Sequence, residues 1–461
     1  MSYLLLIAIV YFLHLLLKMN WICTGIIFLY GLWSLSRHKK IMQGQKAYQD
    51  RFHAVSLYLD TVLYAFLKEE KIDGALRDTV RTMPEGIMKP QVAAAAEKIL
   101  IAADDEQVME AALRELEREF PCKRMKDVHD FMLHVEYYGG EIAKPVQLLL
   151  EDKSRWEKRI KQTIGERKKK ETEVLLSVVA SLLICGVILY LPVLSIDIST
   201  NLLVQIMTVV LILVDDWIYK KALGYRNKDW LSLQLGDDSG KYIKKMEELR
   251  GYKEEKERRM SILLGSIALI ASVICFLLGK TWLVAIGLFL SLFLYQQHKL
   301  GHRLLRKNLI REIQYAFPNW LLDLILLLQS ENVQIALEKS LSYVPGILRR
   351  EVEELIERLH QEPESAEPYH SFLEGFTIPE IHSTMSALYG LTIGNSARGD
   401  KQMNELVERN LTLLDEAETK KLSDSVSVMQ LLFLAPVLLA SFKLLVDMAI
   451  LMMYFIQNPM L

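Results

Sequence analysis

The chain has 461 residues, of which 51% are hydrophobic and 24% charged, and its formal net charge is only −2. This near-neutral balance gives no reason to expect nucleic acid as a partner. Three of the four cysteines lie in apolar runs and Cys122 stands alone after Pro121, so the spacing indicates neither a CxxC site nor a disulfide framework. A chain so rich in both kinds of residue must separate its charged segments from its apolar ones.

Apolar runs come in pairs along the chain and predict membrane hairpins. A run of about 20 apolar residues is long enough to cross a bilayer. The first run has the length of a signal-peptide core, but a second run follows almost at once and no small-residue cleavage site precedes a polar start. The four pairs are 4–17 with 21–35, 174–196 with 202–219, 261–278 with 282–295, and 431–441 with 444–456.

Lysine and arginine predict the topology. They gather at the membrane flanks of segments 38–173, 220–260 and 298–427, whereas the turns inside the hairpins hold at most one lysine. By the positive-inside rule all three segments are cytoplasmic, and parity agrees because two runs separate each segment from the next. We therefore expect a multi-pass membrane protein with eight spans and both termini inside, or fewer if the terminal pairs do not span.

The two large soluble segments share a phrase that indicates a tandem repeat. Ala75-Leu76 is followed after seven residues by Pro84, and Ala336-Leu337 after seven residues by Pro345, at an offset of 261 residues. Apolar residues recur at helical spacing, as at Phe52, Val55 and Leu59, and no alternating strand pattern of useful length appears. Each segment is long enough for a bundle of roughly six helices.

These features predict an all-α, polytopic membrane protein with two tandem cytoplasmic helical-bundle modules, each flanked by membrane hairpins. The expected order is a hairpin in 1–37, module 1 in 38–173, a hairpin in 174–219, a cytoplasmic linker in 220–260, a hairpin in 261–297, module 2 in 298–427 and a hairpin in 428–461.

The layout resembles a known family. A hairpin, a cytoplasmic module with an Ala-Leu-x7-Pro element, a later glycine pair at Gly139-Gly140, and a long basic helix running into a second hairpin are similar to the type II secretion system F-domain family. The chain looks most like two platform proteins of tight-adherence (Flp) pili fused into one. The second module departs from the first, with Gly390, Gly394 and Gly399 in place of the single glycine pair and a proline-containing segment at 363–379.

The resemblance implies an inner-membrane platform of a type II secretion, type IV pilus or Flp pilus machine. Such a platform couples a cytoplasmic ATPase to assembly of pilin or pseudopilin subunits, contacts membrane lipid and forms homo-oligomers. The helix from Pro145 to Tyr190 is the expected transmitter of motion from cytosol to membrane. A secondary transporter built from two repeats and a membrane receptor with cytoplasmic modules are the alternatives.

The residues favour no catalytic site, cofactor or metal. Gly279-Lys280-Thr281 imitates the end of a phosphate loop, but Ile274 stands where glycine is required and the tripeptide lies in a membrane turn. His298 and His302 have helical ligand spacing without an acidic third ligand, so a solvated juxtamembrane face is the simpler interpretation. We therefore expect a non-enzymatic protein whose coupling residues are structural: Ala75, Leu76, Pro84, Gly139, Gly140, Ala336, Leu337, Pro345 and Gly399.

Three charged features have both a functional and a structural interpretation. Lys158, Arg159, Lys161 and Arg167 are a candidate basic interface for anionic lipid or an acidic partner, or plain positive-inside flanking. Lys443 and Asp447 lie one helical turn apart in an apolar run, which favours pairing with each other or a place at a hairpin turn. Asp215-Asp216, beside Trp217, has the composition of an interfacial anchor.

Overall fold

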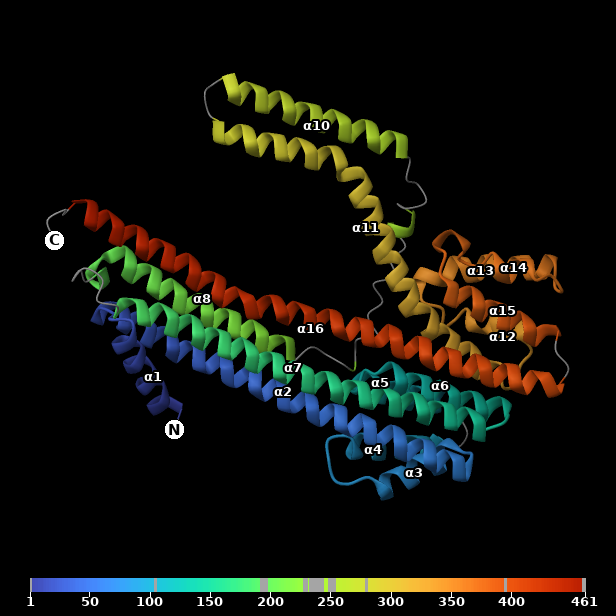
Figure 1. The fold of residues 1–461 in the computed structure, drawn as a ribbon. Coiled ribbons are helices and arrows are strands. Elements are labelled where there is room, and N and C mark those ends of the chain that lie inside the picture. Colours follow the sequence, from blue (N-terminus) through green and yellow to red (C-terminus); the bar gives the residue numbers. More distant parts are fainter. Residues whose placement is uncertain are drawn as a thin grey trace. The chain divides into compact units, whose positions relative to one another are not determined.

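The computed structural model describes residues 2–102, 106–190, 198–226, 231, 244–247, 254–277, 281–393 and 396–457. Every regular element in these ranges is a helix, which confirms the predicted all-α class (Figure 1). The chain forms two compact units: unit 1 comprises Met1–Glu136, Leu149–Gln234 and Thr419–Leu461, and unit 2 comprises Tyr137–Leu148 and Leu235–Glu418.

The helices follow in chain order. The first half contains α1 (Ser2–Leu16), α2 (Trp21–Glu69), α3 (Ile72–Thr82), α4 (Lys89–Ala102), α5 (Glu106–Glu119), α6 (Lys123–Tyr138), α7 (Ala143–Leu189), η1 (Ile198–Thr200) and α8 (Leu202–Arg226). The second half contains α10 (Glu254–Leu277), α11 (Thr281–Leu327), α12 (Val333–Ser340), α13 (Gly346–Gln361), α14 (Glu367–His370), η3 (Glu374–Phe376), α15 (Pro379–Ile393) and α16 (Ser396–Gln457).

Four of these helices are long enough to belong both to an apolar segment and to a soluble module. They are α2, α7, α11 and α16, with 49, 47, 47 and 62 residues. The helix expected over 145–190 is confirmed as α7, which begins at Ala143 and ends at Leu189. Each module is thus joined to apolar sequence by continuous helix, because no glycine or proline breaks the backbone hydrogen bonding at the boundary.

The closing hairpin expected in 428–461 is wrong, because α16 runs unbroken through both of its legs to Gln457. Pro436 lies inside the helix, where it removes one backbone hydrogen bond without ending the helix. Lys443, which separates the two apolar runs, is paired within the helix, as described below. From Thr419 onward the helix belongs to unit 1.

Two helices in the described part of the chain are long and apolar enough to cross a membrane. They are Leu202–Tyr225 and Lys401–Tyr454, and Tyr3–Leu16 is a shorter apolar helix. This result agrees with membrane association. On their outer faces, α8 and α16 expose large apolar side chains such as Leu203, Leu438 and Leu445, as a surface in contact with lipid does.

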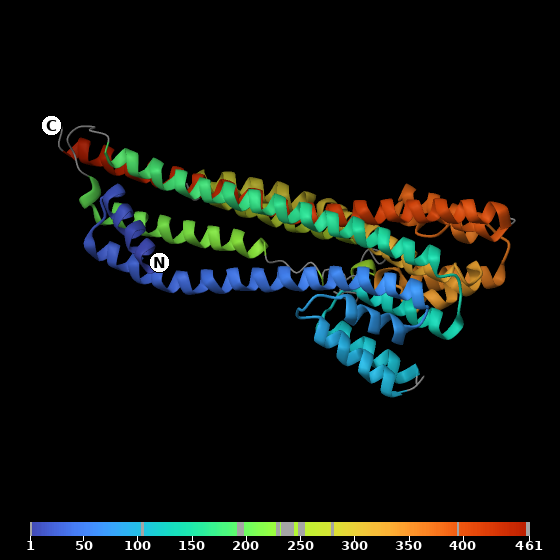
Figure 2. The ribbon, with the colours of Figure 1, turned by 90° about the horizontal axis from the view of Figure 1, so that it is seen from below.

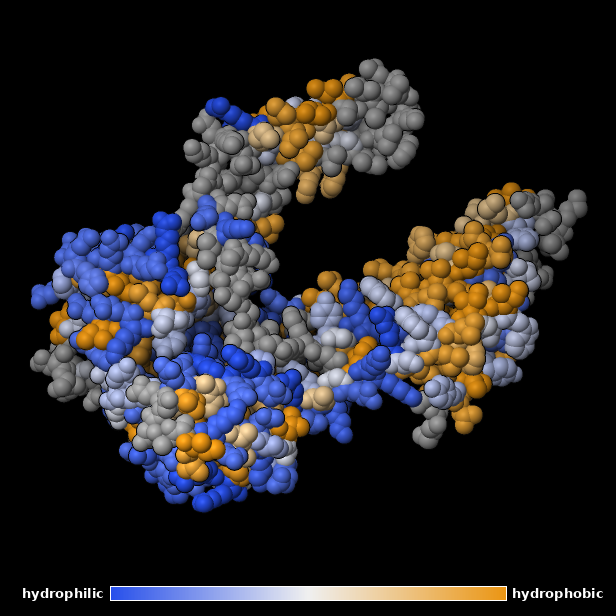
Figure 3. Space-filling view, turned by 180° about the vertical axis from the view of Figure 1, so that it is seen from behind, coloured by the Kyte–Doolittle hydropathy of each residue, from blue (hydrophilic) through white to orange (hydrophobic). Residues whose placement is uncertain are grey.

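The apolar end of unit 1 is a bundle of α1, the start of α2, the end of α7, α8 and the end of α16. Its buried cluster takes Leu13 from α1, Ile27 from α2, Leu189 from α7, Leu211 from α8 and Ala440 from α16. Figure 2 shows α2, α7, α8 and α16 extending in the same general direction toward this end. Apolar side chains gather over it and hydrophilic ones over the modules (Figure 3).

In unit 2, α10 and the first part of α11 form the expected third hairpin. Small residues allow the two helices to approach closely: a side chain added at Gly287 would meet Ser272, and the Ser291 hydroxyl donates to the Gly265 carbonyl at 2.9 Å. Close helix packing through glycine and serine is typical of membrane helices. Residues 278–280, which include most of the imitated phosphate loop, lie outside the described residues.

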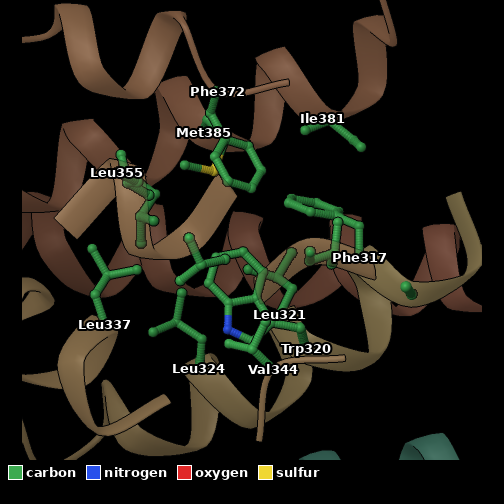
Figure 4. Packing of buried hydrophobic residues seen from close by; sticks show 14 of the residues in the cluster. Phe317, Trp320, Leu321, Leu324, Leu337, Val344, Leu355, Phe372, Ile381 and Met385 are labelled. Atoms are coloured by element: carbon green, nitrogen blue, oxygen red, sulfur yellow. The ribbon is translucent and has the colours of Figure 1, made fainter. Parts of the chain in front are cut away.

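Burial repeats between the two modules at the offset found in the sequence. The pairs separated by 261 residues whose members are both buried include Phe52 and Ile313, Leu59 and Trp320, Leu63 and Leu324, Ala75 and Ala336, Leu76 and Leu337, and Thr79 and Ser340. Helix order repeats as well, since a long incoming helix, shorter helices and a long outgoing helix occur in both. The core of module 2 is centred on Trp320, with Phe317, Leu324 and Leu337 beside it (Figure 4).

Candidate coupling site

The repeated Ala-Leu-x7-Pro element fastens the second helix of each module to its first. Ala75 and Leu76 on α3, and Ala336 and Leu337 on α12, are completely buried. In module 2 the attachment includes a hydrogen bond, because the Trp320 indole donates to the Ser340 hydroxyl at 3.0 Å. Each Ala-Leu pair therefore packs inside its own module. None of the four side chains is exposed to a partner.

The two prolines of the element lie in loops. Pro84 is exposed between α3 and α4, and Pro345 immediately precedes α13 as its N-cap residue. A proline suits the start of a helix because the first backbone N–H groups have no partner within the helix. The loop after α3 is longer, since α4 begins only at Lys89.

Gly139 and Gly140 form the turn between α6 and α7. Their φ angles are +71° and +134°, backbone conformations that glycine adopts far more easily than other residues. The turn belongs to unit 2, where Lys339 of α12 lies over the Tyr138 ring at 5.0 Å and Leu148 joins the hydrophobic core. The structure thus brings Gly139 and Gly140 beside the element that carries Ala336 and Leu337.

The remaining glycines of module 2 have different surroundings. Gly399 lies in the first turns of α16, and no atom is close to the position that its side chain would occupy. None of the described residues requires glycine at this position. Gly390 faces Gln402 closely, and Gly394 lies outside the described residues.

The four residues of the candidate basic interface do not form one surface. Lys158 is exposed, and Lys161 is largely exposed while pairing with Glu157. Arg159 and Arg167 are buried, at 6% and 1% exposure. The two lysines alone remain as candidates for contact with a partner or lipid.

Arg167 instead holds the C-terminal end of α8. Its guanidinium donates to the Tyr225 carbonyl at 2.8 Å, and the Gln45 side chain of α2 donates to the Leu223 carbonyl at 3.4 Å. The last carbonyls of a helix have no partner within it, and they carry the negative end of its dipole. Through Arg167, the basic part of α7 is hydrogen-bonded directly to the C-terminal end of α8.

Module 1 contains a buried polar network centred on His129, which the sequence did not reveal. The completely buried imidazole lies 2.8 Å from the Tyr58 hydroxyl through Nε2 and 2.9 Å from Glu117 through Nδ1. Because an ionised carboxylate only accepts, Nδ1 donates to Glu117. The network joins α2, α5 and α6.

The same network shifts the acidity of its members. Burial raises the pKa of Tyr58 above its ordinary value. Burial also opposes ionisation of Glu117, but hydrogen bonds from His129 and Arg114 outweigh it and lower the pKa of that carboxyl. Arg114 also pairs with Asp130 at 2.6 Å. These groups are paired with one another, which fits a structural role better than chemistry on a substrate.

A second polar cluster joins α2 to α7. Glu157 accepts hydrogen bonds from Ser56 at 2.9 Å and Lys153 at 2.7 Å, and also pairs with Lys161. Lys153 reaches Asp60 as well. Burial alone would raise the pKa of Glu157, but these hydrogen bonds hold it at about 2, below its ordinary value of 4.5.

A buried ion pair joins α6 to α7. The Arg124 guanidinium donates to both oxygens of Asp152, at 2.7 and 3.0 Å, and lies over the Trp156 ring at 5.1 Å. Both charged side chains are almost completely buried. Breaking such a pair on one side is costly because it leaves an uncompensated charge. The long helix α7 is therefore bonded to module 1 as well as to α8.

The apolar bundle of unit 1 carries charged residues of its own. Lys443 and Asp447 are each 1% exposed and pair with one another, as expected, at 2.5 Å within α16. Asp216 accepts hydrogen bonds from Tyr30 and Ser34 of α2. Asp215 does not fit the expected interfacial anchor, because it is buried at 1% exposure and bonded to Ser181 of α7.

Among the described residues no group of three or more histidine, cysteine, aspartate or glutamate side chains is arranged to hold a metal ion. Comparison with protein families, with curated proteins and with solved structures finds no match for the chain.

Proposed function

We propose that this protein is an inner-membrane platform of a type II secretion, type IV pilus or Flp pilus machine, coupling a cytoplasmic ATPase to assembly of pilin or pseudopilin subunits. The resemblance in layout supplies the family, and the continuity of α7 is the observation that supports the role best. Near its start this helix contributes Leu148 to the core of unit 2. It is then bonded to module 1 through Asp152 and ends in the apolar bundle at Leu189.

A protein with this role has to transmit a movement of its cytoplasmic modules to its membrane helices. A flexible linker between them would absorb the movement. The bonds from Arg124 to Asp152 and from Arg167 to the end of α8 fix α7 at two points along its length. A push on the module would therefore move α7 and α8 together. ATP hydrolysis is left to the partner, and the platform itself turns over no substrate.

The proposed partners meet the protein on exposed surfaces. Lys158 and Lys161 of α7 offer positive charge to an acidic face of the ATPase or to anionic lipid. Subunits to be assembled approach the apolar bundle, and the platform works as a homo-oligomer in the inner membrane, with its modules in the cytoplasm.

Because α16 is a single helix, the proposed topology has fewer spans than the sequence predicted. If every other apolar run crosses as expected, the last pair contributes one span in place of two. The C-terminus then lies on the side of the membrane opposite to the modules.

A secondary transporter is the second candidate, and one observation favours it. Buried charges inside an apolar bundle, here Asp215, Lys443 and Asp447, are typical of substrate or ion pathways. Transporter sites, however, are usually built from interrupted helices, whereas α7, α8 and α16 pass their polar residues as continuous helices.

Deletion of the gene from its own organism separates these proposals. The platform proposal expects loss of surface fibres or of secreted protein, with recovery when the full chain is supplied in trans. Normal fibres and secretion, with altered uptake or efflux of a solute, would replace the platform with the transporter.

A further inference from the structure

Asp215 lies in the apolar part of α8 and is 1% exposed. One of its carboxylate oxygens, Oδ2, accepts a hydrogen bond from the Ser181 hydroxyl at 3.0 Å. The other, Oδ1, is buried and has no hydrogen-bond partner among the described residues. A single hydroxyl is a poor substitute for the water shell that an ionised carboxylate requires.

The charged groups around Asp215 are engaged elsewhere. The Lys443 ammonium pairs with Asp447 on its own helix. On the side of α2, Tyr30 and Ser34 donate to the neighbouring Asp216, which also pairs with Lys220 at 2.7 Å. Leu211 of α8, one turn before Asp215, packs in the same apolar cluster as Leu444 of α16, which is next to Lys443. No cation pairs with Asp215 within the described ranges.

We propose that Asp215 is a proton-binding site inside the apolar bundle of unit 1. A carboxylate without a counter-ion in an apolar setting is far more costly than the neutral acid, so binding of a proton removes that cost. The inference rests on the membrane placement of α8 that the proposed function assumes. The ligand is the proton alone, bound as the carboxylate becomes the carboxylic acid.

Release of this proton has a structural consequence. The carboxylate that forms needs a positive charge, and Lys443 of α16 is a buried cation of the same apolar bundle. We expect the two carboxylates, Asp215 and Asp447, to compete for this ammonium. Because Arg167 ties the end of α8 to α7, the state of Asp215 is linked to the helix that enters the module.

A hydrophobic carbodiimide tests the site on the full-length protein in native membranes. Dicyclohexylcarbodiimide reacts with protonated carboxyl groups in apolar surroundings and leaves a stable adduct that mass spectrometry locates on a peptide. We expect an adduct on Asp215 that is lost progressively as the pH is raised from mildly acidic to alkaline. Asp216 and Asp447, which are ion-paired, should remain unlabelled and act as internal controls.

Two further arms make the test decisive. In the Asp215→Asn variant, which keeps the shape of the neutral acid, we expect loss of the adduct with normal insertion into the membrane. A water-soluble carbodiimide should leave Asp215 unmodified in the wild-type chain. Failure of Asp215 to react at every pH, preferential reaction of Asp447, or equal reaction with the water-soluble reagent would overturn the proposal.

The result is independent of the platform proposal. If Asp215 is labelled as expected but deletion of the gene leaves fibres and secretion intact, the proton site stands and the platform role fails. If Asp215 is not labelled but the fibres are lost on deletion, the proton site alone fails.

Discussion

Glu157 shows how single residues fasten the long helix α7 to its module. Its pKa is held at about 2 in the folded chain, below the ordinary value of 4.5. A carboxyl whose pKa is lowered by folding contributes stability that is fully present above the ordinary value and is lost as the pH falls through the folded value. We therefore expect the contact between α2 and α7 to weaken between about pH 4.5 and pH 2.

The measurement is the thermal unfolding midpoint of the full-length protein in detergent, at neutral pH and at acidic pH, for wild type and Glu157→Gln. The difference between the two proteins should shrink as the pH falls. Comparison with the variant is needed because burial raises the pKa of Asp127 and Asp130 and so produces the opposite trend. A constant difference at all pH values would show that Glu157 is not held by these bonds.

The buried leucine of the repeated element gives a second prediction at this scale. Leu337→Ala should destabilise the packing of α12 by about 2–5 kcal/mol, because a completely buried leucine loses its contacts and leaves a cavity. Hydrogen exchange of the α12 and α13 amides in the full-length protein measures the change. Ile335→Ala, on the exposed face of the same helix, is the matched control and should have little effect. Equal effects of the two substitutions would contradict the assigned role of Leu337.

At the scale of residues, the sequence predicted what depends on periodicity and repetition. The Ala-Leu pair of the repeated phrase and the apolar stripe of α2 lie in the core, because regular spacing places apolar residues on one helix face. His129, Arg124 and Arg167 were not foreseen as buried, since their partners lie on helices far away in the chain. Helical spacing alone cannot show which charged side chains meet.

Among the elements, α7 carries the proposed transmission. Thr163 lies in its middle, where its hydroxyl donates to the Arg159 carbonyl. Thr163→Pro should break the helix at a cost of about 3 kcal/mol or more and abolish surface fibres, with the protein still inserted in the membrane. Thr163→Ala removes the same hydroxyl and keeps the helix, so fibres should persist. Electron microscopy of the cells, with membrane fractionation, provides the comparison, and normal fibres in the proline variant would refute transmission through α7.

The unbroken α16 leads to a prediction about topology. In a variant whose native cysteines are replaced by serine, single cysteines at Glu70, Glu338 and Ile456 are treated with an impermeant thiol reagent in intact cells. Under the proposed topology the first two should be protected, since the modules face the cytoplasm, and Ile456 should react, since α16 crosses once. Reaction at Glu70 or Glu338 would overturn the orientation. Protection of Ile456 would show that α16 does not cross.

The closing segment shows why elements were harder to predict than residues. Lys443 and Asp447 interrupt the apolar run, and a charge in lipid favours a turn when each residue is considered alone. In the structure the two side chains satisfy each other within one helical turn, so the helix continues. The sequence is compatible with either a pair or a turn, and no feature of it distinguishes the two.

At the scale of the whole molecule, the two modules repeat the same buried positions, but the two compact units do not coincide with the two modules. The buried positions of the modules repeat at one offset, yet the C-terminal half of α16 belongs to unit 1 and the start of α7 belongs to unit 2. The repeat could be predicted from the sequence, because the same phrase occurs twice. The assignment of the start of α7 to unit 2 and of the end of α16 to unit 1 could not be predicted, because no local sequence pattern marks it.

The central claim is that this chain couples an external motor to subunit assembly and hydrolyses nothing itself. Affinity purification of the full-length protein from native membranes, followed by mass spectrometry and an ATPase assay, tests it most directly. The account predicts that a secretion or pilus ATPase and pilin or pseudopilin subunits are recovered with the protein, and that the chain purified alone has no ATPase activity. Recovery of the intact protein without any such ATPase, or ATP hydrolysis by the chain alone, would contradict it.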